Sequence, residues 1–135
     1  MDGLLRELGA SRVTLRLDTP GDIYPVRFEA LAPGMNSIKG DTSVGDLREA
    51  KTFQWVQREK RLLVQDDLLA DPDPPVPQAL LDVYGARAQM LAPVLKEGEL
   101  HGVISIHYAP GPRVWTDEER AILEQARAQV ERELS

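Results

Sequence analysis

Cysteine is absent from the 135 residues of the chain. Without cysteine there is no disulfide bond, no thiolate zinc site, no cysteine nucleophile and no thioether link to a bilin or c-type haem. Long apolar runs are also absent, since none approaches the roughly 20 residues that cross a bilayer. The first residues have neither the basic nor the apolar stretch of a signal peptide. We therefore expect a soluble, cytoplasmic protein with no membrane partner.

Basic residues are in deficit, with 16 lysines and arginines against 22 aspartates and glutamates and a net charge of −6. This balance is the opposite of what a phosphate backbone attracts, so we expect no nucleic-acid partner. The hydrophobic content of 42% is typical of a globular protein. Because the length is that of one domain, we expect a single domain over residues 1–135.

The first third of the chain predicts a helix followed by a pair of strands. Leucines at helical spacing predict a short amphipathic helix over residues 2–8. Strict alternation of apolar and polar residues then predicts strands over residues 12–18 and 24–31, joined by a loop as a hairpin. Residues 32–46 contain three glycines and little periodicity, so we expect a loop there.

The middle of the chain is rich in loops. We expect a short helix over residues 52–58, a brief strand over 61–64 and a short helix over 77–84 after a proline-rich break. Four aspartates precede that helix, but they lack the spacing of a calcium-binding loop: Asp66, Asp67, Asp71 and Asp73. We therefore predict no metal site.

The last third predicts a second hairpin and a long helix. Residues 86–95 and 100–108 are apolar strands around the tight connection Lys96-Glu97-Gly98-Glu99. Thr116 and Glu119 have the spacing of a capping box at the start of the final helix. The order of these elements predicts an α+β fold, with a central antiparallel sheet and the terminal helices on one face. Loops and short helices would then cover the other face, where a ligand pocket is expected.

Residues 98–108, followed by Trp115-Thr116-Asp117-Glu118-Glu119 and a leucine-containing helix, resemble the C-terminal half of a GAF domain. Residues 52–67 are similar to the short helix and strand of that family. The resemblance implies a six-stranded antiparallel sheet and a sensory or regulatory domain that binds a small molecule, either alone or as part of a larger signalling protein. Few members are enzymes. The absence of cysteine excludes the methionine sulfoxide reductase branch and cysteine-linked bilins, and the Asn-Lys-Phe-Asp-Glu-like signature of the cyclic-nucleotide branch is missing.

With the sheet arranged as in that family, strand alternation predicts which side chains face the ligand. The apolar partners Ile104 and Ile106 would face the helices, so Ser105 and His107 would face the pocket. A single bulge would exchange the two sets. The predicted ligand-binding residues are Arg16, Arg27, Trp55, Tyr84, Gln89, Ser105 and His107. Guanidinium groups bind carboxylates in a bidentate manner, so the resemblance and the two arginines together predict a small anion, carboxylate-bearing or an aromatic acid, and no cofactor.

In this arrangement Arg16 and Arg27 hold the anion, and Trp55 and Tyr84 close the site. The alternative for the arginines is a solvent-facing position or pairing with acidic neighbours. Two other functions stay open from sequence. One is a small cofactor-independent isomerase, hydratase or decarboxylase with His107 as its catalytic acid and base. The other is a module without a ligand that forms a homodimer through its terminal helices.

Overall fold

The structure is a computed structural model that describes residues 2–134, which form five strands and four helices. In chain order these are α1 (Asp2–Leu8), β1 (Arg12–Leu17), β2 (Val26–Leu31), α2 (Lys51–Glu59), β3 (Leu63–Gln65), α3 (Gln78–Asp82), β4 (Ala88–Lys96), β5 (Glu99–Tyr108) and α4 (Asp117–Leu134). Each predicted helix and strand is present, with ends that differ from the prediction by a few residues. No helix of this part of the chain is long and apolar enough to cross a membrane.

The strands form one antiparallel sheet in the order β2-β1-β5-β4-β3. The sheet has five strands in the described residues. The expectation of six strands, which came from the family resemblance, is therefore wrong. The loop between β2 and α2 contributes no strand, because Gly34, Gly40 and Gly45 all take positive φ angles that interrupt extended backbone. The two predicted hairpins, β1–β2 and β4–β5, are both present.

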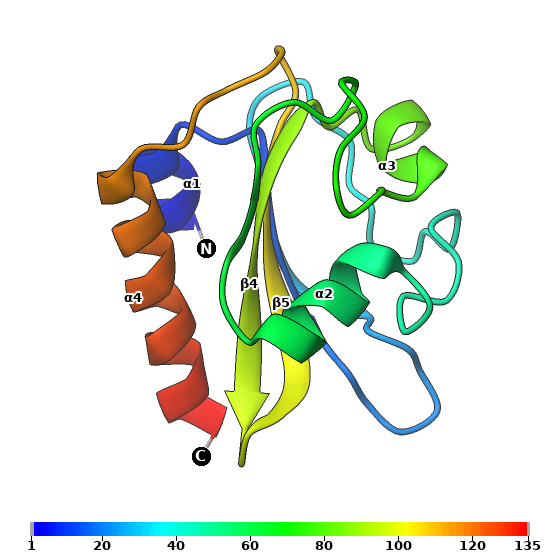
Figure 1. The fold of residues 1–135 in the computed structure, drawn as a ribbon, viewed down its shortest axis with the longest axis vertical. Coiled ribbons are helices and arrows are strands. Elements are labelled where there is room, and N and C mark those ends of the chain that lie inside the picture. The colour runs from blue at the N-terminus through cyan, green and yellow to red at the C-terminus, as the bar shows by residue number, and fades with distance from the viewer. Residues whose placement is uncertain (1, 135) are drawn as a thin grey trace.

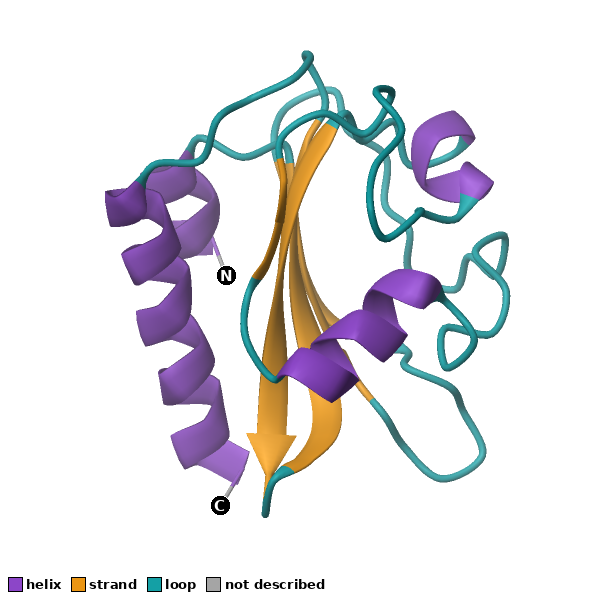
Figure 2. Ribbon diagram, in the orientation of Figure 1, coloured by secondary structure: helices purple, strands orange, loops and turns teal. Residues whose placement is uncertain are grey.

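Helices α1 and α4 pack on one face of the sheet, while α2, α3 and the long loops cover the other (Figure 1). Figure 2 shows how much of this second layer is loop. The predicted α+β arrangement is therefore confirmed. A layer of loops and short helices can form a pocket against a sheet without interrupting the strands.

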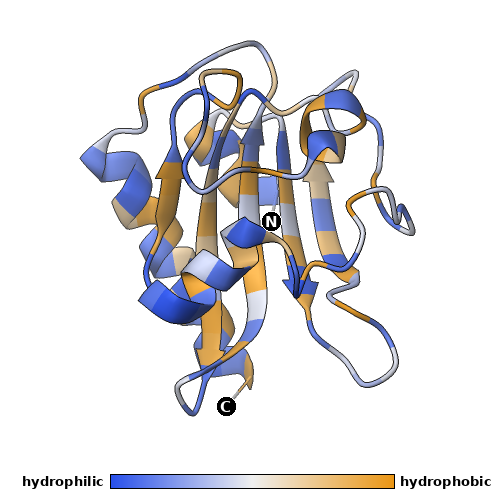
Figure 3. Cartoon of the chain, turned by 45° about the vertical axis from the view of Figure 1, so that its right-hand side comes forward, coloured by the Kyte–Doolittle hydropathy of each residue, from blue (hydrophilic) through white to orange (hydrophobic). Residues whose placement is uncertain are grey.

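The face under α1 and α4 carries the larger hydrophobic core. Val13, Ile104 and Ile106 are fully buried there, together with Leu123 of α4 and Trp115 just before it. Side chains alternate along a strand, so the neighbouring residues of β1 and β5 point to the opposite face. Strands with both hydrophobic and hydrophilic bands are visible in Figure 3.

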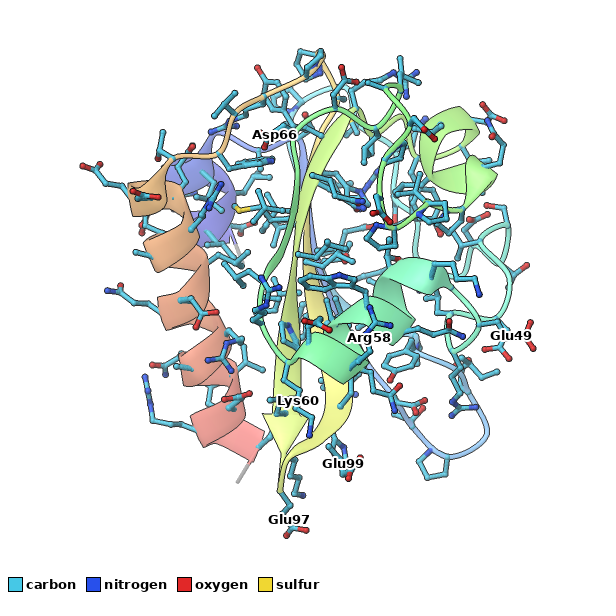
Figure 4. All side chains as sticks on the ribbon, viewed as in Figure 1. Glu49, Arg58, Lys60, Asp66, Glu97 and Glu99 are labelled. Atoms are coloured by element: carbon cyan, nitrogen blue, oxygen red, sulfur yellow. The ribbon has the colours of Figure 1, made fainter. Side chains whose placement is uncertain are left out.

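The predicted capping box sets the start of α4. The backbone N–H of Glu119 donates to Oγ1 of Thr116 at 3.1 Å, and the backbone N–H of Thr116 donates to Oε1 of Glu119 at 2.9 Å. Each bond satisfies a backbone donor that has no partner within the helix. This end of α4 lies near Asp66, at the opposite end of the sheet from Glu97 and Glu99 (Figure 4).

Candidate functional site

A small cavity lies between the sheet and the layer formed by α2, α3 and the loops. Its volume is about 30 Å³. One buried water molecule needs about 10–15 Å³, so the cavity has room for roughly two. Polar side chains come mainly from the strands and apolar ones from the covering layer: Thr14, Arg16, Ile38, Val44, Leu47, Thr52, Phe53, Pro77, Leu80, Tyr84, Gln89, Leu91, Ser105 and His107.

The polar wall is made by the two central strands. In the pairing of β1 with β5, Thr14 lies opposite Ser105 and Arg12 lies opposite His107. All four side chains are at least nine-tenths buried. The hydroxyl oxygen of Thr14 is buried without a hydrogen-bond partner among the described residues. Buried polar groups are normally hydrogen-bonded, so the unpaired hydroxyl of Thr14 is unusual.

Arg16 is 7% exposed, and its guanidinium reaches the cavity from β1. Nη1 donates to the backbone oxygen of Tyr24 at 2.9 Å, and Nη2 donates to the hydroxyl of Tyr84 at 3.2 Å. Both acceptors are uncharged. An arginine carries five N–H donors, so most of those of Arg16 are not used by these two bonds.

Arg12 is a second buried arginine, at 1% exposure, and sequence reasoning did not name it as a site residue. Its Nη1 and Nη2 donate to the backbone oxygens of Tyr84 and Asn36, both at 2.9 Å. Its Nε is buried and has no partner within the described residues. Burial lowers the pKa of Arg12, while the charge of Glu29 acts in the opposite direction. The alternation of β1 places Arg12 on the same side as Arg16, but that pattern does not show that Arg12 is buried.

The charges of the two arginines are not neutralised by a direct ion pair. In the described part of the chain, neither forms a salt bridge with a carboxylate. Both carboxylate oxygens of Glu29 accept hydrogen bonds elsewhere, from the hydroxyl of Ser37 at 2.6 Å and the backbone N–H of Ile38 at 2.8 Å. The carboxylates of Glu29 and Asp41 act on Arg12 and Arg16, respectively, through their charge but form no ion pair with them.

His107 lines the cavity and is held by a contact with Arg12. Nη1 of Arg12 lies 3.4 Å from its Nδ1. A guanidinium only donates hydrogen bonds, so Nδ1 is the acceptor and the imidazole proton lies on Nε2. Burial, reinforced by the charges of Arg12 and Arg16, lowers the pKa of His107 to about 3. The ring is therefore neutral at physiological pH.

Gln89 is held in place by a chain of amide hydrogen bonds. Its Nε2 donates to Oε1 of Gln65 on β3 at 2.7 Å, and Nε2 of Gln65 donates to the backbone oxygen of Pro74 at 2.8 Å. Gln89 and Gln65 are 1% and 5% exposed, so neither amide turns freely. The chain of bonds connects the cavity wall to the proline-rich loop before α3.

Tyr84 closes the cavity beside α3 and is 3% exposed. Its ring lies 6.1 Å from that of His107, and the Arg12 guanidinium lies 5.5 Å from its centroid. Burial raises the pKa of the Tyr84 hydroxyl. A hydrogen bond with Asp41 acts in the same direction, whereas Arg16 opposes it. Tyr84 thereby connects the two arginines to the loop between β2 and α2.

A wider groove lies outside the cavity, between the β1–β2 loop and the loop of residues 38–47. Its volume is about 580 Å³. It shares four lining residues with the cavity, Arg16, Ile38, Val44 and Leu47. The groove is therefore the side from which a solute reaches the Arg16 guanidinium.

Five of the seven residues predicted from sequence lie together at the cavity: Arg16, Tyr84, Gln89, Ser105 and His107. Arg27 and Trp55 do not line it. Arg27 is exposed at a β-bulge, where Leu15 and Arg16 pair with Phe28 and Val26 and leave Arg27 without a partner on β1. Trp55 is half-buried and stacks with Arg61 at 4.9 Å in another groove. We therefore leave both out of the candidate site.

No metal centre accompanies these residues. In the portion of the chain that the structure describes, no three histidine, aspartate or glutamate side chains lie close enough together to hold a metal ion. The aspartates before α3 include Asp66, whose Oδ1 is buried and unpaired. This single oxygen is no ligand set.

The GAF domain family matches residues 1–134 of the chain. A curated relative, the circadian input-output histidine kinase CikA of Synechocystis sp., is 41% identical over 46 residues. The matched segment is 34% of this chain and 6% of that kinase, so the likeness covers only a small part of the relative.

Solved structures similar to the whole chain include the PixJ GAF domain of Thermosynechococcus elongatus in its blue-light-absorbing form. The TM-score is 0.71 at 20% identity, covering 96% of this chain and 79% of that one. Another is a far-red-absorbing dark state with bound biliverdin IXα, with a TM-score of 0.71 at 18% identity, covering 95% and 81% of the two chains. At these identities the likeness is one of fold.

Proposed function

The chain belongs to the GAF domain family, and on that premise we propose that it is a sensory domain that binds a small anion carrying a carboxylate group. One observation carries the proposal. Arg16 lines the cavity, Arg12 is buried against two other lining residues, Tyr84 and His107, and neither arginine forms a salt bridge within the described residues. A sensory domain of this kind would report the presence of its ligand to the rest of a signalling protein.

The energetic reason is the cost of burying charge. Removing an ion from water costs several kcal/mol even after the protein relaxes, and an opposite charge with good geometry offsets that cost. The carbonyl and hydroxyl acceptors of the two arginines offset only part of it. A carboxylate beside Arg16 would supply the missing negative charge and accept bidentate hydrogen bonds. His107 Nε2, Ser105 and Thr14 would donate to the same oxygens.

A bilin does not suit these residues. The sequence has no cysteine to attach one. The cavity volume of about 30 Å³ is also an order of magnitude below the roughly 300–1,000 Å³ of ligand pockets. Buried side chains such as Tyr84 and Leu80 occupy the space between the sheet and α3. We therefore do not extend the biliverdin of the structural neighbour to this chain.

The alternative of an enzyme with His107 as acid and base has less support. A general base works best with a pKa near the operating pH, and the pKa of His107 is lowered to about 3. Its Nδ1 already accepts a hydrogen bond from Arg12. The homodimer through α1 and α4 stays a prediction. Analytical ultracentrifugation, which measures the oligomeric state, tests it.

Thermal unfolding with acid and amide pairs tests the proposed function. Sodium acetate and sodium benzoate are compared with acetamide and benzamide, with sodium chloride holding the ionic strength constant. We expect at least one acid to raise Tm saturably, by about 5–10 °C at a hundredfold excess over Kd, because only the native state binds it. The amides should have no such effect. Stabilisation by an amide equal to that of its acid would contradict an anion site.

Variants separate the site from general salt effects. Arg16→Gln should abolish the stabilisation, while Arg27→Gln, an exposed arginine of the same hairpin, should retain it. If both variants respond like the wild type, the acid binds elsewhere and Arg16 is no part of the site.

A further inference from the structure

The size of the cavity restricts which anion it can hold. Its volume is about 30 Å³, whereas an apolar protein cavity that binds benzene measures about 150 Å³. The space corresponds to roughly two water molecules. Covalently bonded atoms lie closer together than hydrogen-bonded waters, so the space suits a compact group of about three or four non-hydrogen atoms. A benzene ring with a carboxylate attached is much too large for it.

The covering layer does not yield easily to a larger ligand. Phe53 of α2 is 6% exposed, and its ring packs edge-on against Tyr24, with 5.1 Å between centroids. Leu80 of α3 is also 6% exposed, and Tyr84 is fixed by Arg12 and Arg16. Close-packed interiors resist expansion, because added volume forces side chains out of their preferred rotamers. These residues therefore set the far wall of the cavity.

The near wall offers hydrogen-bond donors to one small acceptor group. Two of the five N–H groups of Arg16 donate to Tyr24 and Tyr84, which leaves three. His107 contributes its Nε2 proton, as its Nδ1 faces Arg12. Ser105 and Thr14 lie directly opposite each other, and the hydroxyl of Thr14 is buried without a hydrogen-bond partner among the described residues. A planar guanidinium favours planar oxoanions, with which it forms two parallel hydrogen bonds.

We propose that this cavity selects a planar oxoanion of three or four non-hydrogen atoms, such as formate, acetate or nitrate. This inference rests on the proposed function. The whole ion sits between Arg16 and the Thr14–Ser105 pair, with His107 donating to it. Phe53 and Leu80 leave no room in the cavity for a larger acid, which would have to extend into the adjoining groove and lose contact with the Thr14–Ser105 pair. The shared chemistry is a planar group of two or three oxygens with one negative charge, from an organic acid or from an inorganic ion.

The test is a size series followed by NMR. Sodium formate, acetate, nitrate, butanoate and benzoate are each titrated into ¹⁵N-labelled protein at constant ionic strength, and the amide signals of Thr14, Ser105 and His107 are followed. We expect saturable shifts with the small ions, and a Kd for benzoate at least tenfold higher. The carboxylate and nitrate arms distinguish an organic from an inorganic ligand. Saturable binding of either supports the size limit, whereas binding of nitrate alone would overturn the carboxylate ligand of the proposed function.

Two variants test the wall and the donors separately. Phe53→Leu enlarges the cavity and should bring the Kd of benzoate at least tenfold closer to that of acetate; Leu47→Ala serves if Phe53→Leu fails to fold. Thr14→Val removes a donor at constant volume and should weaken acetate binding about tenfold. If the Kd of benzoate is unchanged in the variant with the enlarged cavity and the Kd of acetate is unchanged in Thr14→Val, the ion does not bind in this cavity and the proposal is overturned.

The outcomes distinguish the two proposals. Benzoate binding as tightly as acetate in the wild type would overturn the size limit but leave the anion-binding sensory function standing. Saturable binding by none of the five anions would overturn both. Tighter binding of the small ions than of benzoate supports both.

Discussion

Arg12 and His107 are direct partners across β1 and β5, and Nη1 of the arginine lies 3.4 Å from Nδ1 of the imidazole. The contact joins a permanent cation to a titratable ring in the interior of the protein. A proton on Nδ1 would both break this hydrogen bond and place a second positive charge beside the first. The pair therefore keeps His107 neutral, with its proton on Nε2.

The first prediction concerns stability at acidic pH. The pKa of His107 is about 3 in the folded protein against an ordinary 6.5, so the unfolded chain takes up the proton first. Stability contributed by the neutral ring is present above pH 6.5 and is lost as the pH falls toward 3. Within that window the loss from this residue is about 1.4 kcal/mol per pH unit. Urea unfolding at several pH values measures it.

The matched variant for this prediction is His107→Gln, whose amide oxygen accepts a hydrogen bond from Arg12 but does not titrate. Its free energy of unfolding should fall less steeply between pH 6.5 and 3 than that of the wild type. Identical slopes for the two proteins would mean that His107 is not the group responsible.

The second prediction concerns Arg12, which connects β1 to two distant loops through the backbone oxygens of Tyr84 and Asn36. Arg12→Ala removes both bonds and leaves buried acceptors unpaired. We expect the free energy of unfolding to fall by about 2–4 kcal/mol, because two hydrogen bonds to a charged group, at about 1.5–3 kcal/mol each, are lost while the desolvation cost of the buried charge is relieved. Arg27→Ala, on the exposed bulge, should change it by less than about 0.5 kcal/mol. Equal losses for the two variants would contradict the role of Arg12.

The third prediction concerns Gly102 of β5, which pairs with Leu17 of β1. A Cβ at this position would lie 2.5 Å from the backbone oxygen of Arg16 and 2.7 Å from Cδ2 of Leu17. Gly102→Ala must therefore push the strands apart beside Arg16, lowering stability by about 1–3 kcal/mol and weakening acetate binding. Gly111→Ala is the control, as nothing lies within 4 Å of its Cβ. If Gly102→Ala changes neither the free energy of unfolding nor the Kd of acetate, the strands separate at this point without cost and the prediction is wrong.

The fourth prediction concerns the amide chain from Gln89 through Gln65 to Pro74. The single variants Gln65→Ala and Gln89→Ala should each lower the free energy of unfolding by about 1–3 kcal/mol, because each leaves a buried amide unpaired. The double variant should cost less than the sum of the two, with a coupling energy of about 0.5–3 kcal/mol. Strict additivity would mean that the 2.7 Å contact contributes nothing.

Most of the fold could be predicted because its determinants are local. Alternation in β1 and β5 and the Thr116–Glu119 capping box depend on residues close in sequence. The side of the sheet occupied by Ser105 and His107 could also be predicted, because β5 keeps its alternation unbroken there. The strand count was wrong, since it came from the family resemblance and not from the glycine-interrupted loop of this chain.

The site was predictable only where the alternation is regular. Arg27 was placed beside Arg16, but the bulge in the β1–β2 pairing moves it out of register, and nothing in the local sequence marks that bulge. Trp55 and Phe53 are two residues apart on α2, and so roughly 200° apart around the helix. Only Phe53 therefore reaches the cavity.

The burial of Arg12 could not be predicted from the sequence for a different reason. Its burial depends on Tyr84 and Asn36, which are 72 and 24 residues away in the chain. A charged residue at the start of a strand is normally solvated, and only tertiary contacts reveal that this one is not.

The measurement that tests the central claim most directly is the ¹H–¹⁵N NMR spectrum of the arginine side chains during an acetate titration at constant ionic strength, with Arg16→Lys identifying the Arg16 signals. The account predicts that the guanidinium signals of Arg16 shift saturably, with the same Kd as the amides of Thr14 and Ser105, while those of Arg27 stay in place. Saturable acetate binding that leaves the Arg16 signals unmoved would contradict it.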